Sequence, residues 1–244
     1  MSHSFGGLVA IRDLSFNVKQ GSIQALIGPN GSGKSTAFDI IAGSILARSG
    51  QIEFESHPIM GLKPVELVCR GLCRTFQATQ IFEDFTVQEN LEVSAQVTAR
   101  MSLWRSYLNT SKFDVLHSSV RRRVGELIER LDLRAVSRKQ GRDLTYRDQK
   151  MLAIANALAT NPKLLLLDEP MAGLTSKETQ EAMEVIRWSR DQGVTVLLIE
   201  HDMRCVMELC ERIVVLNHGE KICEGTPAEV RNSERVIETY LGAD

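Results

Sequence analysis

One segment of nine residues limits the possible folds of this chain more than any other feature. It reads Gly28, Pro29, Asn30, Gly31, Ser32, Gly33, Lys34, Ser35 and Thr36. The segment fits the pattern G-x-x-x-x-G-K-S, in which glycines allow backbone N–H groups to surround phosphate oxygens. An apolar run of strand length at 23–27 precedes it, and a helical pattern at 34–47 follows it. We therefore predict a phosphate-binding loop between a strand and the N-terminus of a helix.

Two side chains of this loop have predicted chemical roles. Lys34 is expected to neutralise the β- and γ-phosphates of a nucleotide, and the hydroxyl of Ser35 is expected to bind Mg²⁺. A glycine-rich turn that arises by chance is the alternative interpretation. The agreement between the pattern and both flanking elements disfavours this alternative.

A pair of carboxylates after a buried strand is the second chemical signal. Leu164–Leu167 is a run of leucines, and Asp168 and Glu169 follow it directly. Ligands bind at the carboxyl ends of strands in parallel sheets, where charged side chains are tolerated. Asp168 is therefore a candidate Mg²⁺ contact, and Glu169 is a candidate general base for an attacking water. Such a pair is common by itself, but the phosphate-binding loop earlier in the chain strengthens the interpretation.

The remaining apolar runs predict an α/β fold with a largely parallel sheet, because strands buried on both faces read as continuous apolar segments. The predicted elements are a strand at 164–167, a helix at 177–191, a strand at 194–199, a hairpin of strands at 213–216 and 221–223, and a helix from 226. Thr175 and Glu178 have the spacing of a capping box, which sets the start of the helix at 177–191.

The segment from about residue 78 to 153 differs from the rest of the chain. It shows helical periodicity, and between Val97 and Lys150 it holds 13 Lys plus Arg against 6 Asp plus Glu. We predict a basic helical lobe inserted in the α/β core. Each charge is most simply part of a solvated helix face, but the local excess also permits docking of acidic protein loops or anionic lipid headgroups. Nucleic acid is a weaker candidate, because the chain as a whole is slightly acidic.

Composition places the chain among ordinary globular proteins. Its 244 residues have a formal net charge of -2 and are 43% hydrophobic. No apolar run approaches the roughly 20 residues of a membrane-spanning helix, and the N-terminus lacks the features of a secretory signal. The five cysteines show neither a disulfide nor a zinc pattern. We expect reduced thiols and a cytoplasmic protein.

With these motifs in this order, the sequence resembles the nucleotide-binding subunits of ATP-binding cassette (ABC) transporters, and most closely the branched-chain amino acid importer group. The resemblance runs from Phe5 to the final Tyr240-Leu241-Gly242. It implies a P-loop NTPase cassette with a mixed or parallel core sheet, a small antiparallel β subdomain and an inserted helical lobe. The implied organisation is a single domain over 1–244, with a nucleotide-binding core at 1–77 and 154–244 and a helical signature lobe at 78–153.

The resemblance assigns roles that residue chemistry alone leaves open. Gln77 matches the glutamine that contacts Mg²⁺ and senses the membrane partner, and His201 matches the switch histidine that contacts the γ-phosphate and helps to hold the attacking water. Phe5 matches the aromatic residue that stacks on adenine, although a place in the core is the alternative. Ala172-Gly173-Leu174 matches the loop that faces the partner subunit.

By the same resemblance, two cassettes form a head-to-tail pair that encloses ATP. Each ATP would lie between the phosphate-binding loop of one chain and the signature loop of the other, here Thr145, Tyr146, Arg147 and Asp148. Closing and opening of the pair would drive transmembrane permease subunits that dock on the helical lobe and on residues 78–92. The group further implies a second, different ATPase subunit, a solute-binding protein, and a place on the inner face of the cell membrane.

Arg147 departs from the family pattern, which has a glycine at this position. Thr145 keeps a hydroxyl for the γ-phosphate, and Tyr146 is common in this group. A long side chain in place of glycine is expected to hold the two cassettes apart. A guanidinium aimed at the γ-phosphate would instead stabilise charge in the transition state. Of the two, we favour crowding, which predicts that Arg147→Gly raises ATP turnover.

Two further positions depart from the family. Members usually have an additional strand before the adenine-stacking aromatic, whereas only four residues precede Phe5. We therefore expect the small antiparallel sheet to lack an edge strand. Thr175 stands where the family commonly has Asp or Asn, which is expected to weaken communication between the two nucleotide sites.

Three functions are consistent with the sequence. The first is ATP hydrolysis that drives uptake of branched-chain or similar amino acids, with amides, urea and other small polar solutes also open. The second is a nucleotide-binding regulatory subunit with a defective signature loop, an interpretation that depends on Arg147. The third is a cassette that acts on nucleic acid or ribosomes, which is disfavoured because such proteins usually carry two cassettes in one chain.

Overall fold

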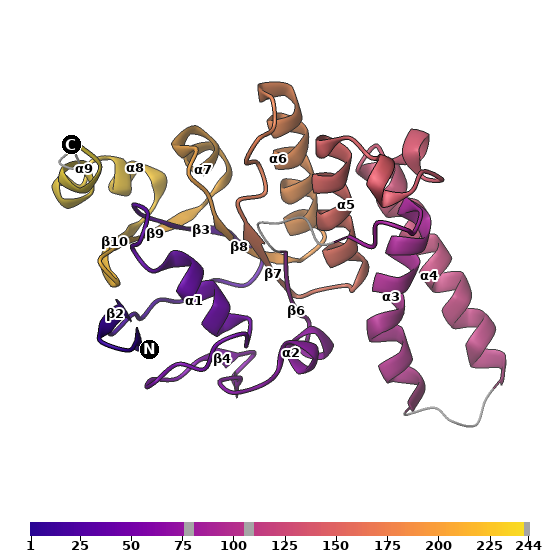
Figure 1. Ribbon diagram of the computed structural model, residues 1–244, viewed down its shortest axis with the longest axis horizontal. Coiled ribbons are helices and arrows are strands. Elements are labelled where there is room, and N and C mark those ends of the chain that lie inside the picture. The colour runs from indigo at the N-terminus through magenta and orange to yellow at the C-terminus, as the bar shows by residue number, and fades with distance from the viewer. Residues whose placement is uncertain (76–80, 105–109, 242–244) are drawn as a thin grey trace.

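A six-stranded sheet forms the centre of the computed structural model, which describes residues 1–75, 81–104 and 110–241 (Figure 1). The strands lie in the order β10, β9, β3, β8, β7, β6. Their bounds are β3 (Ile23–Ile27), β6 (Leu72–Arg74), β7 (Leu164–Asp168), β8 (Thr195–Ile199), β9 (Arg212–Asn217) and β10 (Glu220–Gly225). Neighbouring strands are parallel except β9 and β10, which form the predicted hairpin. The sheet is therefore mixed and largely parallel, as predicted.

The strand order brings three loops with chemical signals to one edge of the sheet. β8 lies between β3 and β7. At the carboxyl ends of β7 and β8, Asp168 is paired with Ile199. The loops after β3, β7 and β8 therefore leave the sheet side by side, which is where ligands bind in this type of fold.

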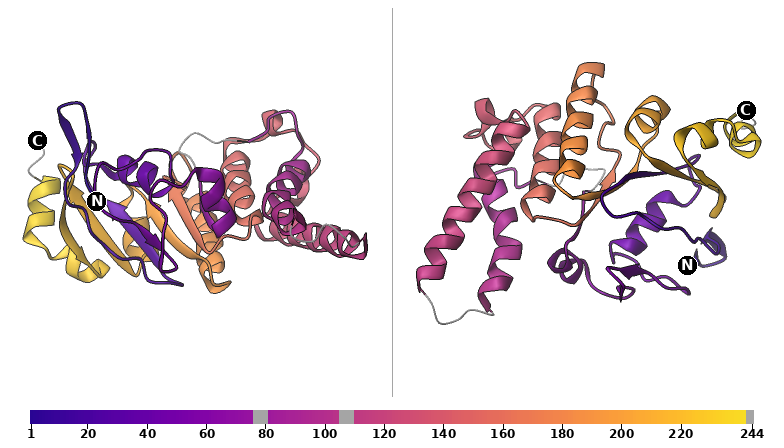
Figure 2. Two further views of the ribbon diagram at one scale, coloured as in Figure 1. Left: turned by 90° about the horizontal axis from the view of Figure 1, so that it is seen from below. Right: turned by 180° about the vertical axis from the view of Figure 1, so that it is seen from behind.

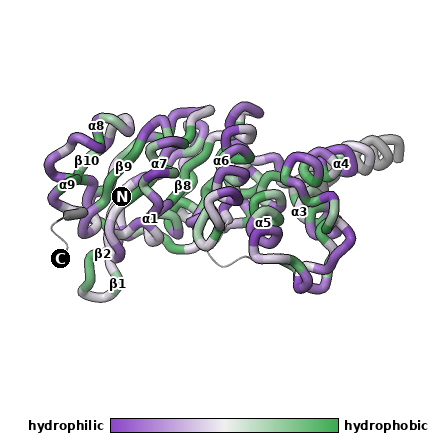
Figure 3. The backbone as a smooth tube through the Cα atoms, turned by 90° about the horizontal axis from the view of Figure 1, so that it is seen from above, coloured by the Kyte–Doolittle hydropathy of each residue, from purple (hydrophilic) through white to green (hydrophobic). Residues whose placement is uncertain are grey.

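The residues of the central strands alternate between two buried clusters, one on each face of the sheet. In β3, Ala25 and Ile27 face one cluster and Leu26 faces the other, and the same alternation holds in β7, β8 and β9. Figure 3 shows hydrophobic stretches at β8 and β9. Because both faces are covered, apolar side chains are favoured at every position, which explains the unbroken apolar runs in the sequence.

Helices cover both faces of the sheet. α1 (Lys34–Ile41) packs on one face. The opposite face is covered by α5 (Tyr146–Ala159), α6 (Ser176–Asp191), α7 (Met203–Leu209) and α8 (Pro227–Arg231). Thr175 and Glu178 form the predicted capping box at the start of α6. A last helix, α9 (Glu234–Leu241), follows α8.

The helix after the phosphate-binding loop is shorter than predicted. It ends at Ile41 and not at residue 47, and Gly43 follows with a φ of 72°. A side chain at Gly43 would collide with the backbone oxygen of Leu62. The left-handed conformation of Gly43 and this close approach terminate the helix, which the apolar pattern alone did not reveal.

Several short elements flank α1. Their bounds are β1 (His3–Phe5), β2 (Leu8–Ile11), β4 (Glu53–Phe54), β5 (His57–Pro58) and α2 (Pro64–Arg70). β1 and β2 pair antiparallel, as do β4 and β5. A strand therefore runs up to Phe5, and within the described residues this sheet consists of β1 and β2. The expectation that a further edge strand is missing stays a prediction. A turn with Gly6 at a φ of 57° allows these few residues to form a hairpin.

The helical lobe consists of α3 (Val87–Trp104), α4 (Thr110–Arg130), two 3₁₀ turns (Arg134–Val136 and Gly141–Asp143) and the start of α5. α3 and α4 form a hairpin that extends away from the sheet (Figures 1 and 2). α5 continues through the predicted boundary at residue 153, and its buried Leu152 and Leu158 belong to the same cluster as the strands. The lobe and the sheet therefore share one hydrophobic core.

In the described part of the chain, no helix has both the length and the apolar character needed to cross a membrane. All five cysteines are free thiols.

Candidate nucleotide site

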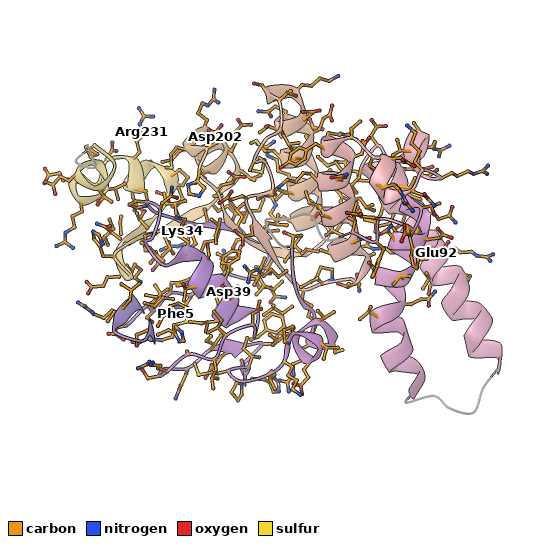
Figure 4. The ribbon with its side chains drawn as sticks, viewed as in Figure 1. Phe5, Lys34, Asp39, Glu92, Asp202 and Arg231 are labelled. Carbon is orange, nitrogen blue, oxygen red and sulfur yellow. The ribbon has the colours of Figure 1, made fainter. Side chains whose placement is uncertain are left out.

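The phosphate-binding loop connects β3 to α1, as the sequence predicts. Lys34 is the first residue of α1, and its Nζ donates hydrogen bonds to Gly28 O at 2.8 Å and to Pro29 O at 2.9 Å (Figure 4). The pKa of Lys34 is lowered because burial disfavours its charged form, and the negative charges of Glu169 and Asp168 offset this effect in part. The lysine that is predicted to neutralise phosphates is therefore held against the loop and within the field of both carboxylates.

Gly28 and Gly33 are required by packing inside the protein as well as by the binding of phosphate. A Cβ atom at Gly28, where φ is 150°, would collide with Leu216 O. A Cβ atom at Gly33, where φ is 100°, would lie 2.5 Å from Ala10 O. At Gly31, where φ is 79°, a Cβ atom would meet nothing within 4 Å. β9 and β2 thus back the loop so closely that two of its glycines are fixed by packing.

The turn between β9 and β10 supports the same loop. Gly219 N donates to Ser32 O at 3.0 Å, and Arg12 N donates to Gly219 O at 2.9 Å. Asn30 and Ser35 of the same loop are exposed. The loop is therefore braced by the turn while parts of it stay accessible to phosphate groups, as a nucleotide site requires.

Asp168 is buried at the end of β7, and it has an arginine partner that the sequence analysis missed. Arg74, at the end of β6, places Nη2 at 2.9 Å from Asp168 Oδ2 and Nη1 at 2.6 Å from Asp39 Oδ1 on α1. The Arg74 side chain is only 7% exposed. This arginine ties β6, β7 and α1 together beside the loop. The available signal in the sequence was a basic residue shortly before Gln77.

Glu169 and His201 meet at the carboxyl ends of two neighbouring strands. His201 Nε2 lies 3.1 Å from Glu169 Oε1. Glu169 has a φ of 49°, a conformation that costs free energy in a residue with a side chain, and its N–H donates to Ile199 O at 3.0 Å. The structure thus holds Glu169 in a strained conformation next to an imidazole. This geometry fits the predicted general base and switch histidine.

A second buried carboxylate, Glu200, orders the loops that carry this pair. Glu200 Oε1 accepts a hydrogen bond from Met171 N at 2.9 Å, and Oε2 accepts one from His201 N at 2.9 Å. Glu200 is 4% exposed. It therefore joins the backbone after Glu169 to the backbone of His201. Glu200 was not among the predicted site residues, and its signal in the sequence is a charged residue directly after an apolar strand.

The signature segment begins α5 and contacts the loop after β7. Thr145 caps the helix by accepting a hydrogen bond from Asp148 N at 3.2 Å. Tyr146 Oη donates to Ala172 O at 3.1 Å, and a Cβ atom at Gly173 would lie 2.8 Å from the Tyr146 ring. The predicted subunit-facing loop therefore packs on the signature segment of its own chain, and this contact requires a glycine.

Arg147 is placed differently from what the crowding hypothesis requires. Its Nη2 lies 2.9 Å from Glu181 Oε2, its Nη1 lies 3.1 Å from Asp148 Oδ1, and its side chain is 14% exposed. Burial works against the charged form, but hydrogen bonds to these two carboxylates outweigh it and raise the pKa of Arg147. The guanidinium is engaged inside its own chain, which removes the structural basis of the crowding hypothesis.

Of the last two predicted residues, only Phe5 lies in the described part of the chain. Phe5 ends β1 with half of its surface exposed, and its ring makes an edge contact with His3 at a centroid distance of 4.7 Å. Phe5 is therefore not a core residue, and it lies on the small sheet beside α1 (Figure 4). Gln77 falls outside the described residues.

Comparison with known proteins places these features in a family. The sequence matches the ABC transporter family over residues 11–172. The chain belongs to the ABC transporter family. Residues 220–244 of this ABC cassette match a second family, described as branched-chain amino acid ATP-binding cassette transporter. The high-affinity branched-chain amino acid transport ATP-binding protein LivG of Salmonella typhimurium is 39% identical over 239 residues, which cover 98% of this chain and 94% of LivG.

Solved ABC cassettes share the fold described above. The ADP conformation of one cassette has a TM-score of 0.83 at 29% identity and covers 99% of this chain and 96% of that one. A dimeric bacterial cassette has a TM-score of 0.76 at 26% identity, with 93% and 95% covered. The predicted P-loop NTPase cassette is therefore confirmed. ABC cassettes bind nucleotide and hydrolyse ATP to power transport. The regulatory interpretation, which depended on Arg147, has no support from these relatives.

Proposed function

We propose that this ABC cassette hydrolyses ATP to drive uptake of branched-chain or related amino acids through separate membrane subunits. The observation that carries hydrolysis is the 3.1 Å contact between His201 and Glu169 beside the phosphate-binding loop. The substrate class is supported by the likeness to LivG and by the match of residues 220–244.

Each residue of the site has a separate role in the proposed hydrolysis. The loop from Gly28 to Ser35 binds the phosphates through backbone N–H groups, and Lys34 neutralises their charge. Glu169 accepts a proton from the attacking water, while His201 contacts the γ-phosphate and orients Glu169. The water oxygen bonds to the γ-phosphorus as the bond to the ADP oxygen breaks. Phe5 stacks on the adenine ring.

The donor set beside the loop fits Mg²⁺, which neutralises phosphate charge and orients the phosphates when bound. Ser35 would contribute its hydroxyl, and Asp168 and Gln77 would complete the protein contacts. Among the described residues, no cluster of three or more His, Cys, Asp or Glu side chains could hold a metal by itself. This agrees with the usual mode of Mg²⁺ binding, in which substrate phosphates supply much of the coordination.

We infer that two cassettes pair head to tail, with a second and different ATPase subunit as the partner. Thr145 and Tyr146 are exposed at the start of α5, where they can reach a nucleotide held by the partner. A related cassette has been solved in dimeric form. Thr175 is engaged in its capping box with Glu178, which supports the expectation of weaker communication through this position.

Permease subunits are proposed to dock at the start of the helical lobe. Phe82 and Phe85 lie just before α3 and are 52% and 41% exposed, with a ring-centroid distance of 5.4 Å. Exposed neighbouring aromatic side chains commonly mark protein interfaces. Docking there would hold the cassette on the cytoplasmic face of the membrane, while a solute-binding protein would act indirectly through the permease. No nucleic acid partner is proposed.

The test is ATP hydrolysis by the purified chain, alone and assembled with its permease and second ATPase subunits. Turnover is expected in the assembled complex, and Glu169→Gln is expected to lower it at least about 100-fold while nucleotide binding is retained. Glu184→Gln, an exposed position on α6, is the matched control. Unchanged turnover in the Glu169→Gln complex would contradict the proposed function.

A further inference from the structure

Arg147 joins the signature end of the lobe to the core. It lies in the first turn of α5, and its Nη2 lies 2.9 Å from Glu181 Oε2 on α6. Its Nη1 lies 3.1 Å from Asp148 Oδ1 and 3.4 Å from Asp132 O, in the turn that follows α4. One guanidinium therefore bridges α5, α6 and the end of α4.

Two neighbours of Arg147 contact the loop that carries the proposed general base. Tyr146 Oη donates to Ala172 O at 3.1 Å, and Lys150 Nζ donates to Glu169 O at 3.3 Å. This loop leads directly into α6, the helix that Arg147 contacts. The first turns of α5, the Glu169 loop and α6 thus form one connected unit.

We propose that Arg147 is a positioning residue whose ion pair with Glu181 fixes the start of α5 on α6. The pair keeps Thr145 and Tyr146 in the orientation in which they meet the nucleotide of the partner cassette. Because Tyr146 also touches the loop after Glu169, the signature segment and the catalytic loop of one chain keep a fixed relative position. The inference rests on the proposed head-to-tail pairing.

The surroundings of the pair distinguish it from an ordinary surface contact. The side chains of Arg147 and Glu181 are 14% and 36% exposed, so water screens their attraction only in part. The planar fork of arginine also reaches Asp148 at the same time, which lysine geometry does not allow. This arrangement gives the arginine a specific role at a position where the family has glycine.

A second ion pair on α6 provides a matched control. Arg187 Nη2 lies 2.8 Å from Glu208 Oε1 on α7, and the two side chains are 33% and 51% exposed. This pair has the same chemistry and starts from the same helix, but it involves neither α5 nor the Glu169 loop. Surface pairs of this kind contribute little to stability or geometry.

The test exchanges the two charges in the assembled transporter and measures ATP turnover. We expect Arg147→Glu and Glu181→Arg each to lower kcat about tenfold with little change in KM for ATP, and the double variant to recover to within about threefold of the wild type. The same exchange at Arg187 and Glu208 is expected to change kcat less than about twofold. Arg147→Gly is expected to lower turnover, in the opposite direction to crowding.

A double variant as slow as the single variants, or a faster Arg147→Gly protein, would overturn the proposal. If a charge reversal prevents folding, the milder variants Arg147→Lys and Glu181→Gln are used instead. We expect each of them to have a lower kcat at an unchanged Tm. An unchanged kcat would contradict the proposal. A wild-type complex without turnover would contradict the proposed function instead. In that case the charge exchange at Arg147 and Glu181 is made in Glu169→Gln cassettes, and their ATP-dependent dimerisation is measured from the size of the particles. Dimerisation that does not change with the charge exchange overturns the ion-pair proposal.

Discussion

His201 Nε2 lies 3.1 Å from Glu169 Oε1, although 32 positions separate the two residues in the chain. They meet because β7 and β8 are adjacent parallel strands, with Asp168 beside Ile199 at their ends. Glu200 then fixes the remaining geometry by accepting hydrogen bonds from Met171 N and His201 N. The distance between the Glu169 and His201 side chains therefore depends on backbone contacts that can be altered without changing either side chain.

Glu200→Ala is expected to lower kcat at least about tenfold with nucleotide binding retained, because misplaced catalytic groups lose much of their effect. The buried N–H of Met171 and the partly buried N–H of His201 lose their acceptor, so the free energy of unfolding is expected to fall by about 1–3 kcal/mol. Turnover of the assembled complex and urea unfolding measure the two effects. Glu200→Gln keeps an acceptor oxygen and should lose less. A loss no larger than that of Glu184→Ala, on the exposed face of α6, would refute the role of Glu200.

Gly28→Ala is expected to lower the free energy of unfolding by more than about 2 kcal/mol and to abolish nucleotide binding, because the added Cβ meets Leu216 O. Gly31→Ala adds the same atom to the same loop where nothing lies within 4 Å. It pays only the strain of a φ of 79°, about 1 kcal/mol. Chemical denaturation and nucleotide titration compare the two variants. Equal destabilisation would show that packing against β9 is not the reason for glycine at position 28.

Acid is expected to weaken the start of α6. Hydrogen bonds from the backbone and hydroxyl of Thr175 lower the pKa of Glu178 below its ordinary value of 4.5. A carboxylate with a lowered pKa stabilises the folded protein above its unfolded pKa, and this contribution is lost as pH falls through the folded value. As the pH is lowered from about 6 to 3, the melting temperature should therefore fall less steeply for Glu178→Gln than for the wild type. Glu184→Gln controls for the loss of one carboxylate, and parallel profiles for wild type and Glu178→Gln would contradict the prediction.

Three cysteines are expected to resist alkylation in the folded protein. Burial raises the pKa of Cys210 to about 12, and burial together with Asp202 raises that of Cys205 to about 11. Burial also raises the pKa of Cys73. Since the thiolate is the reactive form, iodoacetamide at pH 7.5 should modify these residues at least about 100-fold more slowly in the folded than in the unfolded state. Peptide mapping checks this, with the partly exposed Cys69 and Cys223 as internal controls. Rapid native labelling of Cys210 would contradict the packing described here.

Much of the fold could be predicted because its signals are local. The strand at 23–27, the loop after it and the Thr175 capping box each depend on residues that are neighbours in sequence. Helix ends were harder, since α1 stops where Gly43 approaches Leu62, a contact that no local pattern encodes. Strands of two or three residues, such as β4 and β6, are too short to show periodicity.

The direction of the Arg147 side chain could not be predicted, for a related reason. The sequence shows that an arginine stands at the start of the helix that is now α5, but it does not show in which direction the side chain points. The acidic partners that draw it inward are Asp148 next to it and Glu181 on another helix. The packing of two helices decides which of several nearby charges an arginine contacts. A sequence pattern predicts which face of a helix is buried, but not which helix packs against that face.

Three features could be predicted without the structure: a phosphate-binding loop, two carboxylates after an apolar strand, and apolar strands that are buried on both faces of a sheet. These features depend on short-range backbone conformation and on the periods of strands and helices. Three contacts became visible only in the folded protein: Arg74 with Asp168, Glu200 with the backbone of His201, and Arg147 of α5 with Glu181 of α6. Those contacts follow from strand order and helix packing, which are set by the burial of the whole core and not by any one segment.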